Sequence, residues 1–142
     1  MEHVAILRKS WGLTAKILTG QKKIESRWYK DKYSPWDKIH KGEAIYFKES
    51  GEPVTIKARV GKVVQFSNLT QDKVKGLLQR HGKDIGIEKQ DIPEYFKLFK
   101  DKRYCILIFL ENPEQVQPFI INKNGYGMMT AWMTVPSIEV LK

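Results

Sequence analysis

The residues best equipped for chemistry lie in one short segment near the start of the chain, residues 20–27, with the sequence GQKKIESR. This segment contains Lys22, Lys23, Glu25 and Arg27. Charges of both signs on a half-buried segment are costly unless they pair with one another or bind a ligand. The segment is therefore the first candidate for a functional site.

The side chains of this segment suit two kinds of chemistry. A buried lysine can have a lowered pKa, so Lys22 could act as a base or a nucleophile with Glu25 beside it. Lys22 could equally serve as a point charge for a phosphate, and Arg27 could bind a phosphate or Glu25 through paired hydrogen bonds. Structural ion pairs cluster in the same way, so an internal network that closes the fold is a third interpretation.

Local signals place the segment between a helix and a strand. Residues 4–7 form a short apolar run that is typical of a buried strand. Ser10 suits a helix N-cap, apolar residues recur at helical spacing over 13–18, and Gly20 is placed to end the helix. Residues 22–28 then predict a strand.

The alternation of side chains along that strand decides which charges share a face. Glu25 and Arg27 fall on one face, whereas Trp28 points to the opposite face and is expected in the core. Lys22 does not share the charged face by parity. It can join Glu25 and Arg27 only if the turn at Gly20 or a bulge redirects it.

The rest of the chain predicts mostly strands, with two helices before the most apolar one. Residues 29–42 predict a long loop, and loops of this length are often functional. The predicted strands cover residues 44–47, 54–60 with a continuation past a bulge at Gly61 to 66, 104–110, 118–121 and 138–140. The predicted helices run from Thr70 to Gly82 and from Asp91, as a capping box with Glu94, to Phe99.

This order of elements predicts an α+β fold in a single domain, residues 1–142. The sheet is expected to be mixed, and the most plausible arrangement is a small closed or half-closed β-barrel with flanking helices at its ends.

Aromatic side chains near the charged segment suit the stacking of bases. Trp11 precedes the segment by one helix, and Trp36 lies in the lysine-rich loop together with Lys38. Tyr126 lies in a glycine-rich turn whose backbone could approach a ligand. A solvated loop and a plain hairpin turn would have the same composition.

Charge and cysteine usage narrow the class of partner. The chain has 25 Lys and Arg against 16 Asp and Glu, a net charge of +9, which favours a polyanion although it also serves solubility. The single cysteine, Cys105, permits no internal disulfide and fits a reducing cytoplasm. The longest apolar run is too short to cross a bilayer. We therefore expect a cytoplasmic protein with no membrane partner.

Several classes of site lack the residues that they need. Three scattered histidines and one cysteine give no zinc spacing. The chain has no P-loop, no G-x-S-x-G motif and no dinucleotide-binding fingerprint. We expect neither a metal nor another cofactor.

Gly20, Lys22, Glu25 and Arg27 together match the pattern G-x-K-x-x-E-x-R. In its strand–helix–strand setting, this pattern resembles the signature of ASCH domains, the activating signal cointegrator homology family of the PUA-like superfamily. The resemblance covers most of the chain and extends through the strands that follow residue 43. It implies a PUA-like barrel with a cleft beside the first helix.

The resemblance also implies a partner, which is RNA or a modified nucleotide, with DNA as a further option. The residues expected to contact it are Ser10, Trp11, Lys22, Lys23, Glu25, Arg27, Trp36, Lys38 and Tyr126. Some ASCH proteins are amidohydrolases that act on acetylcytidine, and others are reported ribonucleases, so a small hydrolase with Lys22 and Glu25 as catalytic residues is the alternative. In the amidohydrolase branch a threonine follows the lysine by three residues, and Glu25 occupies that position here.

Overall fold

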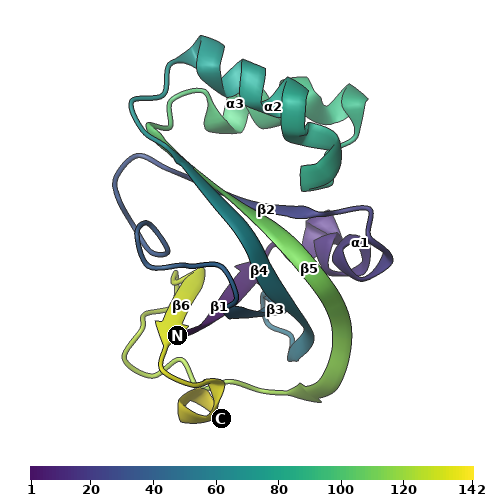
Figure 1. The fold of residues 1–142 in the computed structure, drawn as a ribbon, viewed down its shortest axis with the longest axis vertical. Coiled ribbons are helices and arrows are strands. Elements are labelled where there is room, and N and C mark those ends of the chain that lie inside the picture. The colour runs from purple at the N-terminus through teal and green to yellow at the C-terminus, as the bar shows by residue number, and fades with distance from the viewer.

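A six-stranded mixed sheet that curls into a half-barrel forms the frame of the protein (Figure 1). The computed structural model describes residues 1–142. The strands follow the order β2-β5-β4-β3-β1-β6, so β2 and β6 are the two edges of the sheet. Strands β1 and β3 run parallel, and the other neighbours are antiparallel. The predicted α+β class and the half-closed barrel are confirmed.

The strands differ greatly in length. Their bounds are Glu2–Leu7 (β1), Ile24–Tyr29 (β2), Ala44–Glu49 (β3), Val54–Phe66 (β4), Tyr104–Phe119 (β5) and Trp132–Val135 (β6). The long strands β4 and β5 pair along their length and curve together, so that they carry the sheet from one end of the molecule to the other (Figure 1). Their register shifts between Val60 and Lys62, which confirms the predicted irregularity at Gly61.

Three α-helices complete the fold. Helix α1 (Leu13–Thr19) follows β1, whereas α2 (Gln71–Ile85) and α3 (Ile92–Phe99) connect β4 to β5 and lie together over one end of the sheet (Figure 1). Single 3₁₀ turns precede α1 and α3, and another ends the chain at Ile138–Leu141. No helix has both the length and the apolar character that a membrane crossing requires.

Three apolar clusters hold the fold together, and two of them position the helices against the sheet. The first lies inside the curl of the sheet and includes Ile45, Phe47 and Ile108, which are fully buried. The second joins α2 and α3 to β2 and β5, and it includes Leu78 and Trp28. Trp28 therefore lies in the core, as its strand parity predicted. The second cluster also fixes the position of α3 relative to β2.

The predicted end of α1 at Gly20, the cap of α2 at Thr70 and the end of α3 at Phe99 are confirmed, whereas the predicted end of α2 is not. Helix α2 continues past Gly82 to Ile85 and ends at Gly86, whose φ of 98° is left-handed. Gly82 is buried inside α2, and a Cβ there would make only an ordinary van der Waals contact with Ile92, at 3.5 Å, so the helix passes through this glycine instead of ending at it. The prediction of a stop at Gly82 is therefore wrong.

The predicted caps of two helices are also wrong. Ser10 lies in a 3₁₀ turn, and Gly12 is the N-cap of α1, so no side chain caps that helix. Asp91 is the N-cap of α3 but its side chain makes no capping hydrogen bond, so the predicted box with Glu94 does not form. In both places a 3₁₀ turn immediately precedes the helix, and the helix begins without a side-chain cap.

The C-terminal strand predictions fail for reasons visible in the packing. Residues 118–121 are not a separate strand, because β5 itself extends to Phe119. Residues 138–140 belong to a 3₁₀ turn that buries Ile138 and Leu141 on one side. Ile138 and Leu141 are three residues apart, which is the spacing of one 3₁₀ turn, whereas the prediction of a strand relied only on the apolar composition.

Thr70 caps α2, and its oxygen accepts a hydrogen bond of 3.3 Å from the amide of Lys73. We predict that Thr70→Ala lowers the free energy of unfolding by about 1 kcal/mol, because one amide of the first turn loses its partner. Urea denaturation monitored by circular dichroism measures this change. Thr70→Ser keeps the hydroxyl and should retain most of the stability; equal losses in both variants would contradict a capping role.

Candidate ligand-binding site

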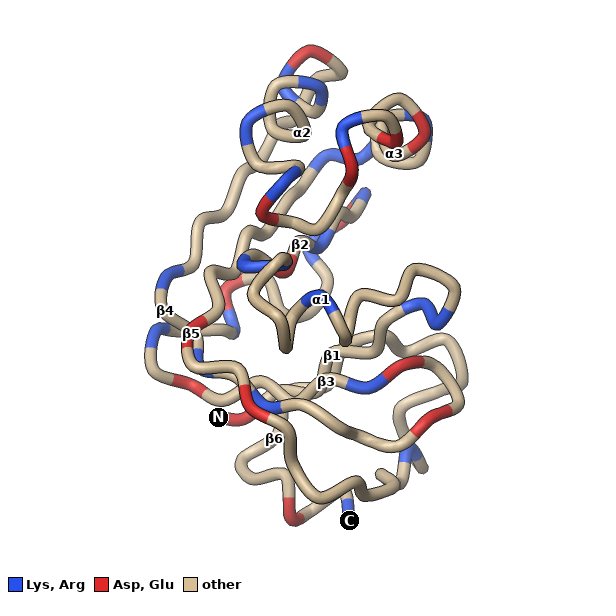
Figure 2. Tube along the Cα trace, turned by 90° about the vertical axis from the view of Figure 1, so that its right-hand side faces the viewer, with Lys and Arg blue, Asp and Glu red and all other residues tan.

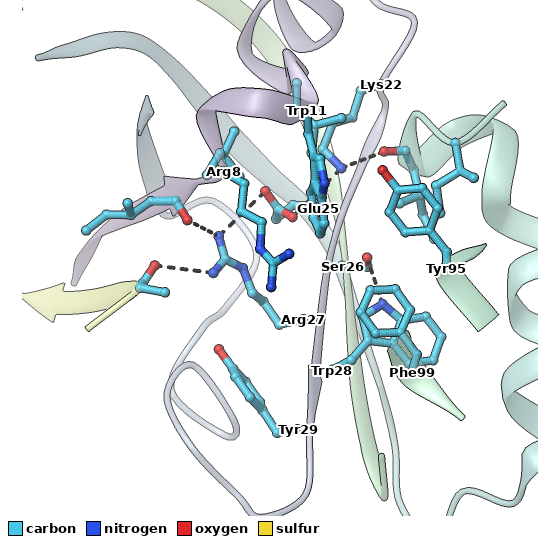
Figure 3. Close-up of a pocket in the computed structure, with 16 residues that line it drawn as sticks. Arg8, Trp11, Lys22, Glu25, Ser26, Arg27, Trp28, Tyr29, Tyr95 and Phe99 are labelled. Atoms are coloured by element: carbon cyan, nitrogen blue, oxygen red, sulfur yellow. Dashed lines mark hydrogen bonds and ion pairs between the residues drawn. The ribbon is translucent and has the colours of Figure 1, made fainter. Parts of the chain in front are cut away.

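A pocket of about 210 Å³ opens between β1, α1, β2 and α3. It lies at the seam of the half-barrel, where the edge strand β2 faces β1 across the gap that the sheet leaves open. The lining is mostly apolar, with eleven hydrophobic residues among sixteen. Its polar and charged side chains are those of Arg8, Lys22, Glu25, Ser26 and Arg27 (Figure 3).

Arg27 bridges the seam with its guanidinium group. One terminal nitrogen donates to the carbonyl of Ala131 at 3.2 Å, and the other donates to the carbonyl of Ile6 at 3.3 Å (Figure 3). The same group lies 5.1 Å from the ring centre of Trp132, a cation–π contact. Arg27 therefore ties β2 to β1 and to the residue before β6, where no backbone ladder joins them.

A turn brings Lys22 to the charged face of β2. Gly20 ends α1 with a φ of 83°, a conformation that glycine adopts easily, and the amide of Lys22 then donates to the carbonyl of Lys16 at 2.9 Å. Strand β2 begins only at Ile24, so the alternation of the strand does not apply to Lys22. The turn at Gly20 therefore redirects Lys22 toward Glu25, as the sequence required for the two to lie together.

The ammonium group of Lys22 is held by backbone carbonyls. Its Nζ donates to Ile85 at 2.6 Å and to Ile24 at 2.8 Å, and it lies 3.8 Å from Oε1 of Glu25. Ile85 is the last residue of α2, where carbonyls lack helical partners and the helix dipole is negative. Burial lowers the pKa of Lys22, and the carboxylate of Glu25 opposes this shift in part.

Glu25 and Arg27 each have one buried polar atom without a partner. These atoms are Oε2 of Glu25 and Nε of Arg27. Oε2 lies 3.9 Å from a terminal nitrogen of Arg27, which is close enough for an ion pair but too far for a hydrogen bond. Glu25 is only 3% exposed, so leaving this oxygen unpaired is costly. Both side chains line the pocket, so each of these atoms would gain a partner if a ligand reached it.

Aromatic rings form the side of the pocket that α3 covers. Phe99 of α3 stacks on Trp28 with a centroid separation of 4.8 Å and an interplanar angle of 5°. Tyr95 of α3 contacts Trp11 across the mouth at 5.2 Å (Figure 3). Ser26 accepts a hydrogen bond of 2.9 Å from the indole of Trp28. The faces of these aromatic side chains suit a flat ligand that stacks on them.

Arg8 adds a second guanidinium group at the mouth. It lies over the ring of Trp11 at 4.7 Å, on the side of the pocket toward which Arg27 also extends (Figure 3). Elsewhere the lysines and arginines are spread over the helices, the long strands and the loops, with acidic residues among them (Figure 2). Arg8 and Arg27 thus place two guanidinium groups at this mouth.

The structure brings together four of the residues expected at the site: Trp11, Lys22, Glu25 and Arg27 line the pocket. Ser10 is exposed and lines a neighbouring polar hollow, and the side chain of Lys23 is exposed outside the pocket. Trp36 packs edge-on against Tyr104 at 5.1 Å, away from the pocket. Lys38 and Tyr126 line a separate hollow beside β6.

Sequence reasoning missed Arg8, Tyr95 and Phe99. Arg8 follows the first strand directly, and only the curl of the sheet brings it beside Arg27. Tyr95 and Phe99 are four residues apart on α3, so they share a helix face. The aromatic richness of this short helix was the available signal, but nothing local indicates that it covers a pocket.

A double-mutant cycle tests whether Lys22 and Glu25 are coupled in the folded protein. We predict that Lys22→Met and Glu25→Leu each lower the free energy of unfolding by about 3–5 kcal/mol, because the first leaves the buried Glu25 with Arg27 alone, at 3.9 Å, and the second leaves Lys22 and Arg27 without a counter-charge. The double variant should lose clearly less than the sum, as measured by urea denaturation.

The exposed pair of Lys9 and Glu52, with Nζ and Oε1 2.6 Å apart, provides a matched control for this cycle. Solvent screens that pair, so its coupling should be much smaller. Strictly additive losses at Lys22 and Glu25 would show that the two residues do not stabilise each other.

Comparison by sequence gives no match, since no family model and no curated protein matches the chain. Comparison of the fold with solved structures does give matches. A mutant structure of the ASCH protein of Zymomonas mobilis matches with a TM-score of 0.69 at 16% identity and covers 98% of this chain and 93% of that one. The structure titled simply ASCH from the same organism gives a TM-score of 0.68 at 17% identity, covering 98% of this chain and 90% of that one.

A more distant match is the N-terminal domain of Staphylothermus marinus McrB. Its TM-score is 0.51 at 15% identity, and the alignment covers 84% of this chain and 76% of that one. The similarity to the Zymomonas mobilis protein extends along nearly the whole chain and agrees with the pattern of residues 20–27. The protein therefore has the mixed half-barrel fold of an ASCH domain.

Proposed function

We propose that this protein binds a single-stranded nucleic acid, RNA first and DNA as the alternative, by taking one base into the pocket at the seam. The observation that carries the proposal is the pair of buried atoms without partners, Oε2 of Glu25 and Nε of Arg27. A ligand that donates to the first and accepts from the second would satisfy both atoms.

A nucleobase has the required combination of groups. Its edge presents donors and acceptors side by side, and its faces are flat and can stack on aromatic rings. The pocket volume of about 210 Å³ lies below the roughly 300–1,000 Å³ of pockets for drug-sized ligands, which favours a ligand of one ring system. The continuous row of aromatic rings on the α3 side of the pocket, from Trp11 through Tyr95 and Phe99 to Trp28, suits the stacking of such a ring.

The mouth of the pocket suits the phosphate that follows the base. The guanidinium of Arg8 lies over Trp11 without an ion-pair partner among the salt bridges of the protein. An arginine in this position can bind a phosphate through two parallel hydrogen bonds. Ligands of this kind also fit the resemblance to ASCH domains, and a cytoplasmic location, where such ligands occur, is part of the proposal.

We predict that Glu25→Gln and Arg27→Lys each weaken the binding of a short single-stranded RNA by roughly 10- to 100-fold, because each alters one charged hydrogen-bonding group of the pocket. Fluorescence anisotropy titrations at several salt concentrations measure the affinity, with single-stranded DNA as a parallel ligand. Glu25→Gln keeps the size of the side chain, whereas Arg27→Lys loses part of the bridge to Ile6 and Ala131, so affinity is compared only among variants that remain folded.

Matched controls separate the pocket from general charge effects. Glu114→Gln and Arg80→Lys make the same chemical changes at exposed positions on β5 and α2, and they should leave affinity unchanged. Thermal unfolding of every variant checks the fold. Absence of RNA and DNA binding at low salt, or equal losses in pocket and control variants, would refute the proposal.

A second candidate function is a small hydrolase that acts on an acylated nucleoside, with Lys22 and Glu25 in the catalytic roles. The favourable observation is that burial lowers the pKa of Lys22, which increases the fraction of neutral amine available as a base or nucleophile. Cys105 offers no competing nucleophile, because it is fully buried and burial raises the pKa of its thiol.

If this activity exists, Lys22→Ala should lower turnover of acylated nucleosides such as acetylcytidine by about 10²- to 10⁴-fold, the usual contribution of a general base. The rate should rise with pH through the lowered pKa of Lys22, because only the neutral amine accepts a proton. Mass spectrometry of a nucleoside panel measures the products. Lys16→Ala is the matched control, because Lys16 binds the carbonyl of Gly86 next to α2 but does not line the pocket. A panel without any product would exclude this candidate.

A further inference from the structure

A second hollow adjoins the pocket on the side of β6. Its volume is about 530 Å³, and it lies between the long loop after β2 and the segment that leads into β6. We name this cavity the side hollow. Its lining residues include Ser34, Lys38, His40, Tyr126, Trp132 and Thr134.

The pocket and the side hollow share one wall. Ala131 lines the pocket and Trp132, the next residue, lines the side hollow. The guanidinium of Arg27 lies 5.1 Å from the ring centre of Trp132, and the hydroxyl of Tyr29 donates to the carbonyl of Ser34 at 2.9 Å. Arg27 and Tyr29 belong to the pocket, whereas Trp132 and Ser34 belong to the side hollow. The two cavities therefore lie on either side of the contact between Arg27 and Trp132, which a strand that occupied both would have to cross.

The side hollow carries positive charge and no carboxylate among its lining residues. Lys38 is exposed, and its Nζ donates only to the hydroxyl of Ser34, at 3.2 Å. The one carboxylate that forms an ion pair with a histidine of the hollow is that of Glu43, 3.8 Å from His40, and it is already bound by His3 at 2.9 Å. This charge suits the phosphodiester of a nucleic acid strand.

Tyr126 presents its ring from a turn that is held in place. Its carbonyl accepts a hydrogen bond from the hydroxyl of Thr130. Lys123 donates to the carbonyls of Met128 at 3.3 Å and Thr130 at 3.0 Å, so the turn is closed around one ammonium group. The side chain of Tyr126 keeps contact with solvent, at 38% exposure of the residue. An exposed ring on a fixed turn is a platform for stacking a base.

We propose that the side hollow is a second nucleotide site, which takes the nucleotide next to the one whose base enters the pocket. The connecting phosphate is the one already assigned to Arg8, Lys38 binds the phosphate beyond the second nucleotide, and Tyr126 stacks on the second base. The inference rests on the proposed function and makes it more specific: the ligand is a strand of at least two nucleotides, not a free nucleoside.

The test compares ligands of increasing length on the full chain. Affinities for a nucleoside monophosphate, a dinucleotide and a tetranucleotide are measured by calorimetry and competition, in RNA and DNA series. The wild-type protein should bind the dinucleotide and the tetranucleotide at least fivefold more tightly than the monophosphate. This gain is what one stacked base contributes at the lower end of the usual range.

The variants assign that gain to the side hollow. Tyr126→Ala should remove most of it, Tyr126→Phe should keep it, and Lys38→Ala should reduce the slope of log affinity against log salt concentration by about one. All three should leave the affinity for the monophosphate unchanged. Lys75→Ala, an exposed lysine on α2, serves as the charge-matched control.

The possible outcomes separate this inference from the function on which it rests. Binding of the monophosphate without a gain for longer ligands would overturn the second site and leave the pocket proposal standing. A gain that survives in both Tyr126→Ala and Lys38→Ala would overturn it as well. Absence of binding for every ligand would refute both proposals together.

Discussion

The bridge that Arg27 makes across the seam is the interaction on which the site depends. The half-barrel has two free edges, β2 and β6, and no backbone ladder closes it. Arg27 joins them instead, through its hydrogen bonds to the carbonyls of Ile6 and Ala131. A side-chain bridge leaves space around it that a backbone ladder would fill, and the pocket occupies this space. A charge in such a place needs a counter-charge, which Glu25 supplies at 3.9 Å.

The helices α2 and α3 complete the pocket from outside the sheet. Lys22 binds the last carbonyl of α2, so the end of that helix, the turn after α1 and the start of β2 are tied to one ammonium group. Helix α3 packs against α2 and supplies Tyr95 and Phe99 as the remaining wall. The parts of the pocket are therefore distant in sequence and depend on one another, and a change in any of these contacts should reach the ligand.

The sequence predicted the parts of this arrangement that follow from local rules. Strand alternation correctly placed Glu25 and Arg27 on the same face and Trp28 in the core. It could not place Lys22, whose position depends on the left-handed conformation of Gly20 and on the carbonyl of Ile85 far along the chain. Arg8, Tyr95 and Phe99 join the pocket only through the curl of the sheet and the packing of α3. Trp36 was predicted at the site because it is an aromatic residue in a lysine-rich loop. In the structure it packs against Tyr104 and does not line the pocket.

The contacts of Lys22 also bear on the choice between binding and catalysis. To act on a substrate, the amine would have to give up at least one of its bonds to Ile24 and Ile85, and a buried carbonyl would then lose its partner. A base in the pocket requires no such exchange, because Oε2 of Glu25 and Nε of Arg27 already lack partners. The lowered pKa of Lys22 is explained by its burial at the end of α2 and needs no catalytic purpose. The contacts of Lys22 therefore agree better with the proposed binding function, in which Lys22 has a structural role and Glu25 and Arg27 contact the ligand, than with catalysis by Lys22.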